Sequence, residues 1–125
     1  MTSGAKINKR TFWYLPYLRD EDVRDEYLNL TGERKVIYGE AVECKANISP
    51  ASGYAQTEMF GNLDNYDKVI SPLPADFPIT ENDVLFIDKP VEYDENDNPL
   101  YDYSVRRVAR SLNHTSVAVR KVKVS

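Results

Sequence analysis

Alternation of apolar and polar residues is the main pattern along this chain. From Val36 to Ile48 apolar side chains take every second position, interrupted only at Glu40. A period of two predicts a β-strand with one buried face. At about 3.3 Å per residue this strand would run for about 40 Å, so we expect a bend near Gly39 or a projecting end.

Shorter strand-like segments follow, separated by turns. Residues 57–60 and 66–70 have the composition of strands, and residues 84–87 form a continuous apolar run typical of a buried strand. Turn-rich residues 94–99 and 112–114 each separate two apolar segments, which predicts two antiparallel hairpins. The sequence therefore predicts an all-β, mainly antiparallel fold, either a small β-barrel or a sandwich. We expect its core to include Val42, Val69, Leu85, Ile87, Val105, Val108, Val117 and Val119.

The first 35 residues have a different pattern, and we assign them to an N-terminal arm that precedes a β domain at residues 36–125. Residues 1–10 are polar and basic, and aromatic side chains then crowd around Pro16. This combination predicts an extended arm that ends in an aromatic anchor. Residues 20–27 are the one candidate helix, short and with acidic residues in its first turn, and Gly32 would end it.

One long loop interrupts the predicted strands. Residues 49–56 are small and polar and include both Pro50 and Gly53. Such a composition is typical of a mobile surface loop.

Charge is distributed unevenly along the 125 residues, which have the usual length of one domain. The net charge is −4, yet residues 103–125 contain six basic and no acidic side chains. This segment could bind a partner or neighbouring subunit, grip the phosphates of a nucleic acid, or form a solvated face of a hairpin. The basic residues concerned are Arg106, Arg107, Arg110, Arg120, Lys121 and Lys123.

The residues that usually carry chemistry are sparse. Cys44 and His114 are the only residues of their types, and the five glycines are scattered rather than gathered in a phosphate-binding loop. The acidic turn at residues 94–98 departs from a calcium loop because Pro99 replaces the required Gly and Val105 the required Glu. We expect no catalytic residue, no cofactor and no metal ion. We also expect no membrane contact, since no apolar run has the length of a membrane span.

Several short segments, taken in order, resemble the head-closure proteins of long-tailed bacteriophages, also called stoppers or head–tail connectors. The similarity spans residues 36–125 and depends on the order of the segments rather than on one motif, and residues 1–35 add a weaker similarity. The segments are Ile48-Ser49-Pro50, Gly53, Phe60-Gly61, Tyr66-Asp67-Lys68-Val69-Ile70, residues 78–88 (PITENDVLFID) and residues 103–113 (YSVRRVARSLN).

This resemblance implies a structural, non-enzymatic role in the phage neck. A ring of copies, a dodecamer or a hexamer, would lie below the portal and adaptor rings, retain packaged double-stranded DNA and dock the tail terminator or tail tube. The protein would be made in the bacterial cytoplasm and end in the virion. In that family a loop from each subunit closes the channel, and the match places it at Ile48, Ser49, Pro50, Ala51, Ser52, Gly53, Tyr54, Ala55 and Gln56.

Two other readings of the sequence stay open. The chain could be another neck or tail-completion protein, such as an adaptor or a terminator, although an adaptor should be richer in helix. It could also be a nucleic-acid-binding β-barrel module that uses the basic hairpin. An enzyme would need a pocket with converging titratable groups, which no spacing here indicates.

Overall fold

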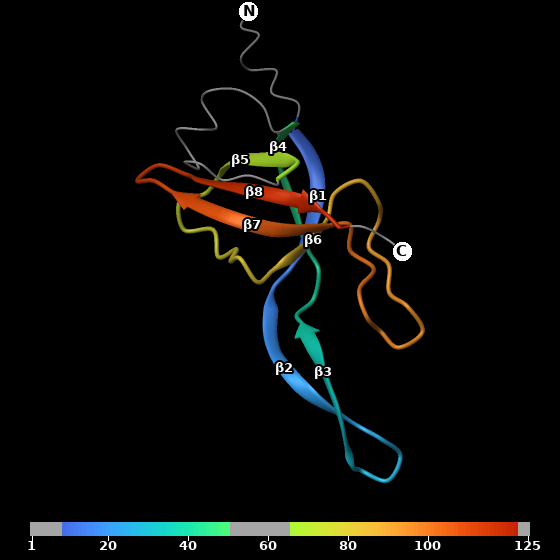
Figure 1. The fold of residues 1–125 in the computed structure, drawn as a ribbon. Helices are drawn as coiled ribbons and strands as arrows, with labels where there is room; N and C mark the ends of the chain where they lie inside the picture. The colour runs from blue at the N-terminus through green and yellow to red at the C-terminus, as the bar shows by residue number, and fades with distance from the viewer. Residues whose placement is uncertain (1–8, 51–65, 123–125) are drawn as a thin grey trace, which may run out of the picture.

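A closed antiparallel β-barrel is the centre of the fold (Figure 1). The computed structural model describes residues 9–50 and 66–122, which form eight strands and no helix. Six strands close the barrel in the order β1-β4-β5-β8-β7-β6, and the prediction of an all-β, antiparallel fold is confirmed. They are β1 (Lys9–Leu15), β4 (Val42–Pro50), β5 (Lys68–Leu73), β6 (Val84–Phe86), β7 (Tyr103–Arg110) and β8 (Thr115–Lys121).

Apolar side chains at alternate strand positions fill the barrel. Phe12 of β1, Leu85 of β6 and Val117 of β8 have no exposed surface. Six of the eight predicted core residues are buried, and Val108 is partly buried and packs against the core. Val42 is the one prediction that is wrong. Val42 is 40% exposed because it is the first residue of β4, where fewer side chains surround the strand.

The N-terminal segment differs from its prediction. Residues 9–15 are not an arm but the barrel strand β1, which pairs with both β4 and β6, so the barrel includes residues before position 36. The predicted helix at residues 20–27 is wrong, because β2 (Tyr17–Arg24) continues through most of it. Glu21 and Asp22 of β2 lie opposite Lys35 and Arg34 of β3 (Leu30–Tyr38), and such cross-strand pairs favour a strand.

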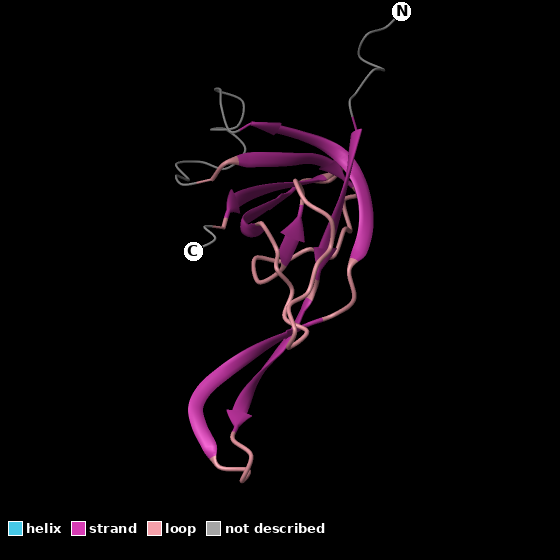
Figure 2. Cartoon of the chain, turned by 90° about the vertical axis from the view of Figure 1, so that its right-hand side faces the viewer, coloured by secondary structure: helices cyan, strands magenta, loops and turns pink. Residues whose placement is uncertain are grey.

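Together β2 and β3 form a two-stranded hairpin that projects from the barrel, as both views show (Figures 1 and 2). We call residues 17–38 the hairpin arm. The chain leaves the barrel at Pro16 and returns at Gly39, whose N–H donates to the Pro16 carbonyl over 2.7 Å. A Cβ on Gly39 would lie 3.0 Å from Pro16 Cγ, so the close approach favours glycine. The predicted bend near Gly39 and the projecting end are both present.

The remaining predicted strands match the structure in part. β6 and the β7–β8 hairpin confirm two predictions, and the strand predicted at residues 66–70 is present as β5, which runs on to Leu73. The other predicted hairpin has its turn at residues 94–98, where Asp94 accepts the N–H groups of Asn96 and Asn98, but its strand pairing is reduced to one bridge between Tyr93 and Pro99. The predicted strand at residues 57–60 lies outside the described residues.

Candidate interaction surfaces

The first residues of the predicted channel loop belong to a strand. Ile48, Ser49 and Pro50 end β4 and lie opposite Ile70, Val69 and Lys68 of β5. Ile48 also packs against the core, so its burial and its pairing hold this stretch in the barrel. The other predicted loop residues, Ala51, Ser52, Gly53, Tyr54, Ala55 and Gln56, lie outside the described residues.

The basic residues of the C-terminal segment do not converge on one site. Arg106, Arg107 and Arg110 lie on β7, and Arg120 and Lys121 end β8. In the antiparallel register Arg110 is opposite Thr115 at one end of the ladder, whereas Lys121 is opposite Tyr103 at the other. Lys123 lies outside the described residues.

Arg110 is a structural residue. Its guanidinium donates to the carbonyls of Ala75 and Ile79 at 3.3 and 2.9 Å, and to Thr115 Oγ1 at 3.1 Å. These hydrogen bonds tie the connector between β5 and β6 to the β7–β8 hairpin. Replacing Arg110 would therefore disturb the fold as well as any partner contact that this residue makes.

Arg106 occupies a β-bulge. Val105 lies opposite Val119 and Arg107 opposite Ala118, which leaves Arg106 as the extra residue. A bulge turns a side chain away from the regular alternation of a strand. The Arg106 Nε is buried and has no hydrogen-bond partner among the described residues.

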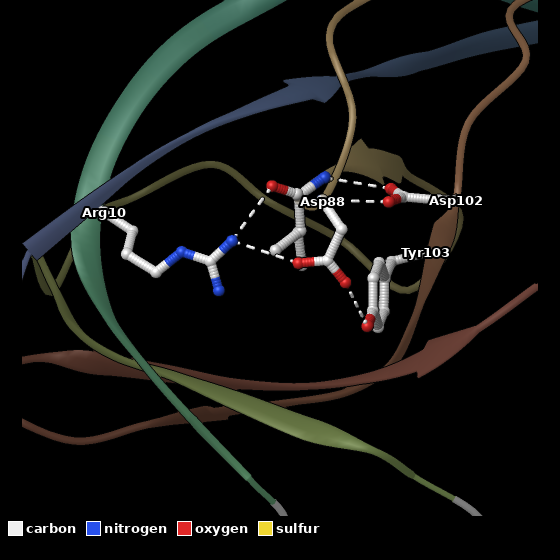
Figure 3. A network of polar contacts seen from close by, with 5 residues as sticks. Arg10, Asp88, Asp102 and Tyr103 are labelled. Atoms are coloured by element: carbon white, nitrogen blue, oxygen red, sulfur yellow. Dashed lines mark hydrogen bonds and ion pairs between the residues drawn. The ribbon is translucent and has the colours of Figure 1, made fainter.

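Arg10, Asp88, Asp102 and Tyr103 form a polar network that the sequence did not reveal (Figure 3). Asp88 accepts hydrogen bonds from Arg10 Nη2 at 3.0 Å and from the Tyr103 hydroxyl at 2.8 Å. Asp102 accepts the N–H groups of Ile87 and Asp88, both at 2.9 Å. The network thus links β1, β7 and the segment after β6.

Electrostatics within this network favour the ionised form of Asp88. Burial by itself would raise the pKa of the carboxyl, but hydrogen bonds from Arg10 and Tyr103, with the positive charges of Lys68 and Arg10, hold it below its ordinary value. The pKa of Tyr103 is raised by burial and by its hydrogen bond to Asp88. Both residues act here as structural partners.

The hairpin arm is anchored to the barrel through Asp83. This buried carboxylate accepts the Tyr17 N–H at 2.7 Å, the Thr80 N–H at 2.8 Å and the Thr80 hydroxyl at 3.1 Å. Lys35 Nζ donates to the Asn96 carbonyl at 3.3 Å, which connects the arm to the turn at residues 94–98. These contacts set the direction of the arm relative to the barrel.

An apolar groove lies at the base of the arm. It has a volume of about 500 Å³ and lies between the arm and the segment at residues 93–99. Its apolar lining includes Leu15, Leu18, Val36, Tyr93 and Pro99. We call this hollow the base groove, and its lining gives it the character of a binding surface for an apolar side chain.

Other titratable groups are held in their neutral forms. Burial, with Tyr101 beside it, raises the pKa of Tyr38 to about 12, and burial together with Glu43 raises the pKa of Cys44 to about 11. The described residues hold no group of three or more His, Cys, Asp or Glu side chains placed to bind a metal ion. In residues 9–50 and 66–122 no helix has the length and apolarity needed to span a membrane.

Comparison with known proteins returns no relative: no protein-family model, no curated protein and no solved structure matches this chain.

Proposed function

We propose that this chain is a head-closure protein of a bacteriophage neck. It would form a ring below the portal and adaptor, close the DNA channel after packaging and present the surface on which the tail docks. The observation that carries this proposal is the ordered resemblance of the segments between residues 48 and 113. No catalytic role is proposed for any residue.

The position of those segments in the barrel supports the proposal. Residues 48–50 end β4, residues 66–70 enter β5, residues 78–88 contain β6, and residues 103–113 contain β7 with the turn after it. The segments that carry the resemblance therefore coincide with strands that build the barrel. In this proposal the channel loop begins after Pro50, because the preceding residues are paired with β5.

The central experiment mixes the purified chain with portal–adaptor complexes and with DNA-filled heads that lack tails. We expect rings at the portal in negative-stain images, and DNA that stays protected from nuclease. A chain that does not bind these complexes would overturn the neck assignment. Binding to free duplex DNA that falls steeply with salt, without binding to the portal, would favour the nucleic-acid-binding module instead.

The channel-loop assignment needs a matched pair of variants. One removes residues 51–56, and the other replaces them with a Gly/Ser segment of the same length. We expect the shortened chain to bind filled heads but release DNA to nuclease, whereas the length-matched chain retains more of it. Full retention by the shortened chain would show that these residues do not close the channel.

A further inference from the structure

We propose that the hairpin arm joins copies of this chain: the apolar tip of one arm inserts into the base groove of the next copy. We call residues 25–30 the arm tip. The proposal deepens the ring proposed above by naming its contact. Both halves of that contact lie within the described residues, so the contact itself can be tested in the free chain.

The arm tip exposes three large apolar side chains at the far end of the arm. Tyr27 is 76% exposed, Leu28 is 73% exposed and Leu30 is 60% exposed. Exposed apolar residues scattered singly need no explanation, but a cluster of them marks a contact surface. Tyr and Leu side chains gathered at one point suit insertion into an apolar hollow.

A dense set of hydrogen bonds holds the arm tip in one shape. The Asp25 carboxylate accepts the N–H groups of Tyr27 and Asn29 at 2.8 and 2.9 Å, and the Asp25 carbonyl accepts the Leu28 N–H at 2.9 Å. Arg24 Nη1 donates to the Leu28 carbonyl at 2.9 Å. The tip is therefore preorganised, which lowers the entropy cost of binding.

Leu28 adopts a backbone conformation that leucine rarely takes. Its φ is +67°, in the left-handed region, where glycine or asparagine is the usual residue. Strain of this kind persists where the surrounding structure enforces it, and it is commonly found at functional sites. A large apolar side chain is thus kept at a position where folding alone would favour glycine.

The body of the arm offers no apolar face on which its own tip could fold back. β2 is mostly charged and exposed, and its carboxylates pair with β3: Arg34 lies 3.0 Å from Asp22 and 3.9 Å from Asp20. Eight residues of β2 span about 25 Å at about 3.3 Å each, so the tip lies far from the base groove of its own chain. The arm tip therefore reaches a base groove only on another copy.

A second copy fits because the two apolar surfaces complement each other. The described residues include nine exposed large apolar side chains, of which three form the arm tip and Leu18, Val36 and Tyr93 line the base groove. The groove, of about 500 Å³, has room for side chains of the size of Tyr27 and Leu28. A tip-to-base contact is heterologous, so repeating it gives a ring or a filament.

The size of this contact predicts weak association of the free chain. One tip in one groove buries a few hundred Å², well below the ~1,200 Å² of a stable interface. Association should therefore be seen at high concentration, or when other contacts bring copies together. Sedimentation at protein concentrations up to about millimolar, comparable with a Kd of about that size, is the proper range.

The first test replaces Leu28 with glycine. Leu28→Gly removes the apolar side chain but relieves the positive φ, so we expect the thermal midpoint to stay the same or rise. Self-association measured by sedimentation should weaken about tenfold or more, the amount expected from losing one buried Leu. Unchanged association would overturn the proposal, as would a wild-type chain that stays monomeric throughout the concentration range. A clearly lowered midpoint would assign Leu28 to folding instead.

The second test locates the contact by cross-linking in a Cys44→Ala background. One chain carries Leu28→Cys and a size-tagged chain carries Leu18→Cys, and a short bismaleimide should join them as a mixed dimer. Leu112→Cys replaces Leu28→Cys in the control, because Leu112 is 96% exposed but belongs to neither surface. Equal yields from the two pairs would overturn the proposal. If the chain does not bind portal complexes, the proposed role in the neck is wrong, but the cross-linking result still decides whether the arm tip contacts the base groove.

Discussion

The barrel and the hairpin arm are both built from antiparallel strands, but different forces hold them. In the barrel, side chains such as Phe12, Leu85 and Val117 are fully buried, so apolar burial supplies the stability. In the arm, charged residues occupy both strands and most of their surface is exposed. The arm depends on cross-strand pairing and on the anchors at its base.

This difference shows that strand pairing alone does not make a stable unit. An isolated two-stranded hairpin is at best marginally stable in water, because it has no core. Here Asp83, Pro16 and Gly39 join the hairpin to the barrel, and the barrel supplies the stability that the arm lacks. A projecting arm can then expose an apolar tip without unfolding.

The largest expected effect comes from the barrel core. Leu85→Ala should lower the free energy of unfolding by about 2–5 kcal/mol, because Leu85 is fully buried between β1 and β7. Leu30→Ala, in the arm tip, is the matched control and should change it by about 0.5 kcal/mol or less. Urea unfolding measures both. Equal losses from the two substitutions would contradict the division between barrel and arm.

A smaller effect is expected at the junction. Asp83→Ala removes the acceptor for Tyr17 and Thr80 and should cost about 1–3 kcal/mol of unfolding free energy. Asp83→Asn keeps one carbonyl oxygen, which can still accept the Tyr17 N–H, while its amide group faces the Thr80 N–H.

Hydrogen exchange separates these two variants. The amides of β2 should exchange faster in Asp83→Ala than in Asp83→Asn. The increase in exchange rate should be larger than the difference in the free energy of global unfolding between the two variants predicts. Identical exchange of β2 in both variants would show that Asp83 stabilises only the turn at Thr80.

Acid should weaken the polar network around Asp88. The pKa of Asp88 is lower in the folded chain than in the unfolded one, so its stabilisation is complete above the unfolded value and disappears as the pH falls through the folded value. Its side chain is 38% exposed, which limits the contribution to about 1 kcal/mol or less.

Asp88→Asn provides the test of this contribution. Urea unfolding from about pH 6 to about pH 2 should show a smaller loss of stability in the variant than in the native chain. The same slope in both would mean that other carboxylates account for the acid sensitivity.

The smallest effect is expected from the ion pairs of the arm. Arg34→Gln removes the pairs with Asp20 and Asp22, yet these side chains are largely exposed, so the change should be about 0.5 kcal/mol or less. Thermal unfolding in low and high salt measures it. A loss above about 1 kcal/mol would show that charge pairs, rather than the anchors, hold the arm.

The sequence by itself determined most of the barrel. Alternation reports burial on one side of a strand, so β4, β6, β7 and β8 and most of the core followed from the positions of apolar residues. The same logic failed for residues 17–35, because both faces of most of the arm meet solvent and leave no periodic signal. Acidic residues in β2 were then mistaken for the first turn of a helix.

Only the tertiary structure decided which polar residues act together. The hydrogen bond between Asp83 and Tyr17 joins residues 66 positions apart in the sequence, and the one between Asp88 and Arg10 joins residues 78 positions apart. Sequence patterns carry no information about pairs so far apart. The closure of the barrel likewise gave Arg110 internal partners, although its sequence context grouped it with surface charges. Burial leaves a local pattern in a sequence, whereas a hydrogen bond between distant segments exists only after the chain has folded.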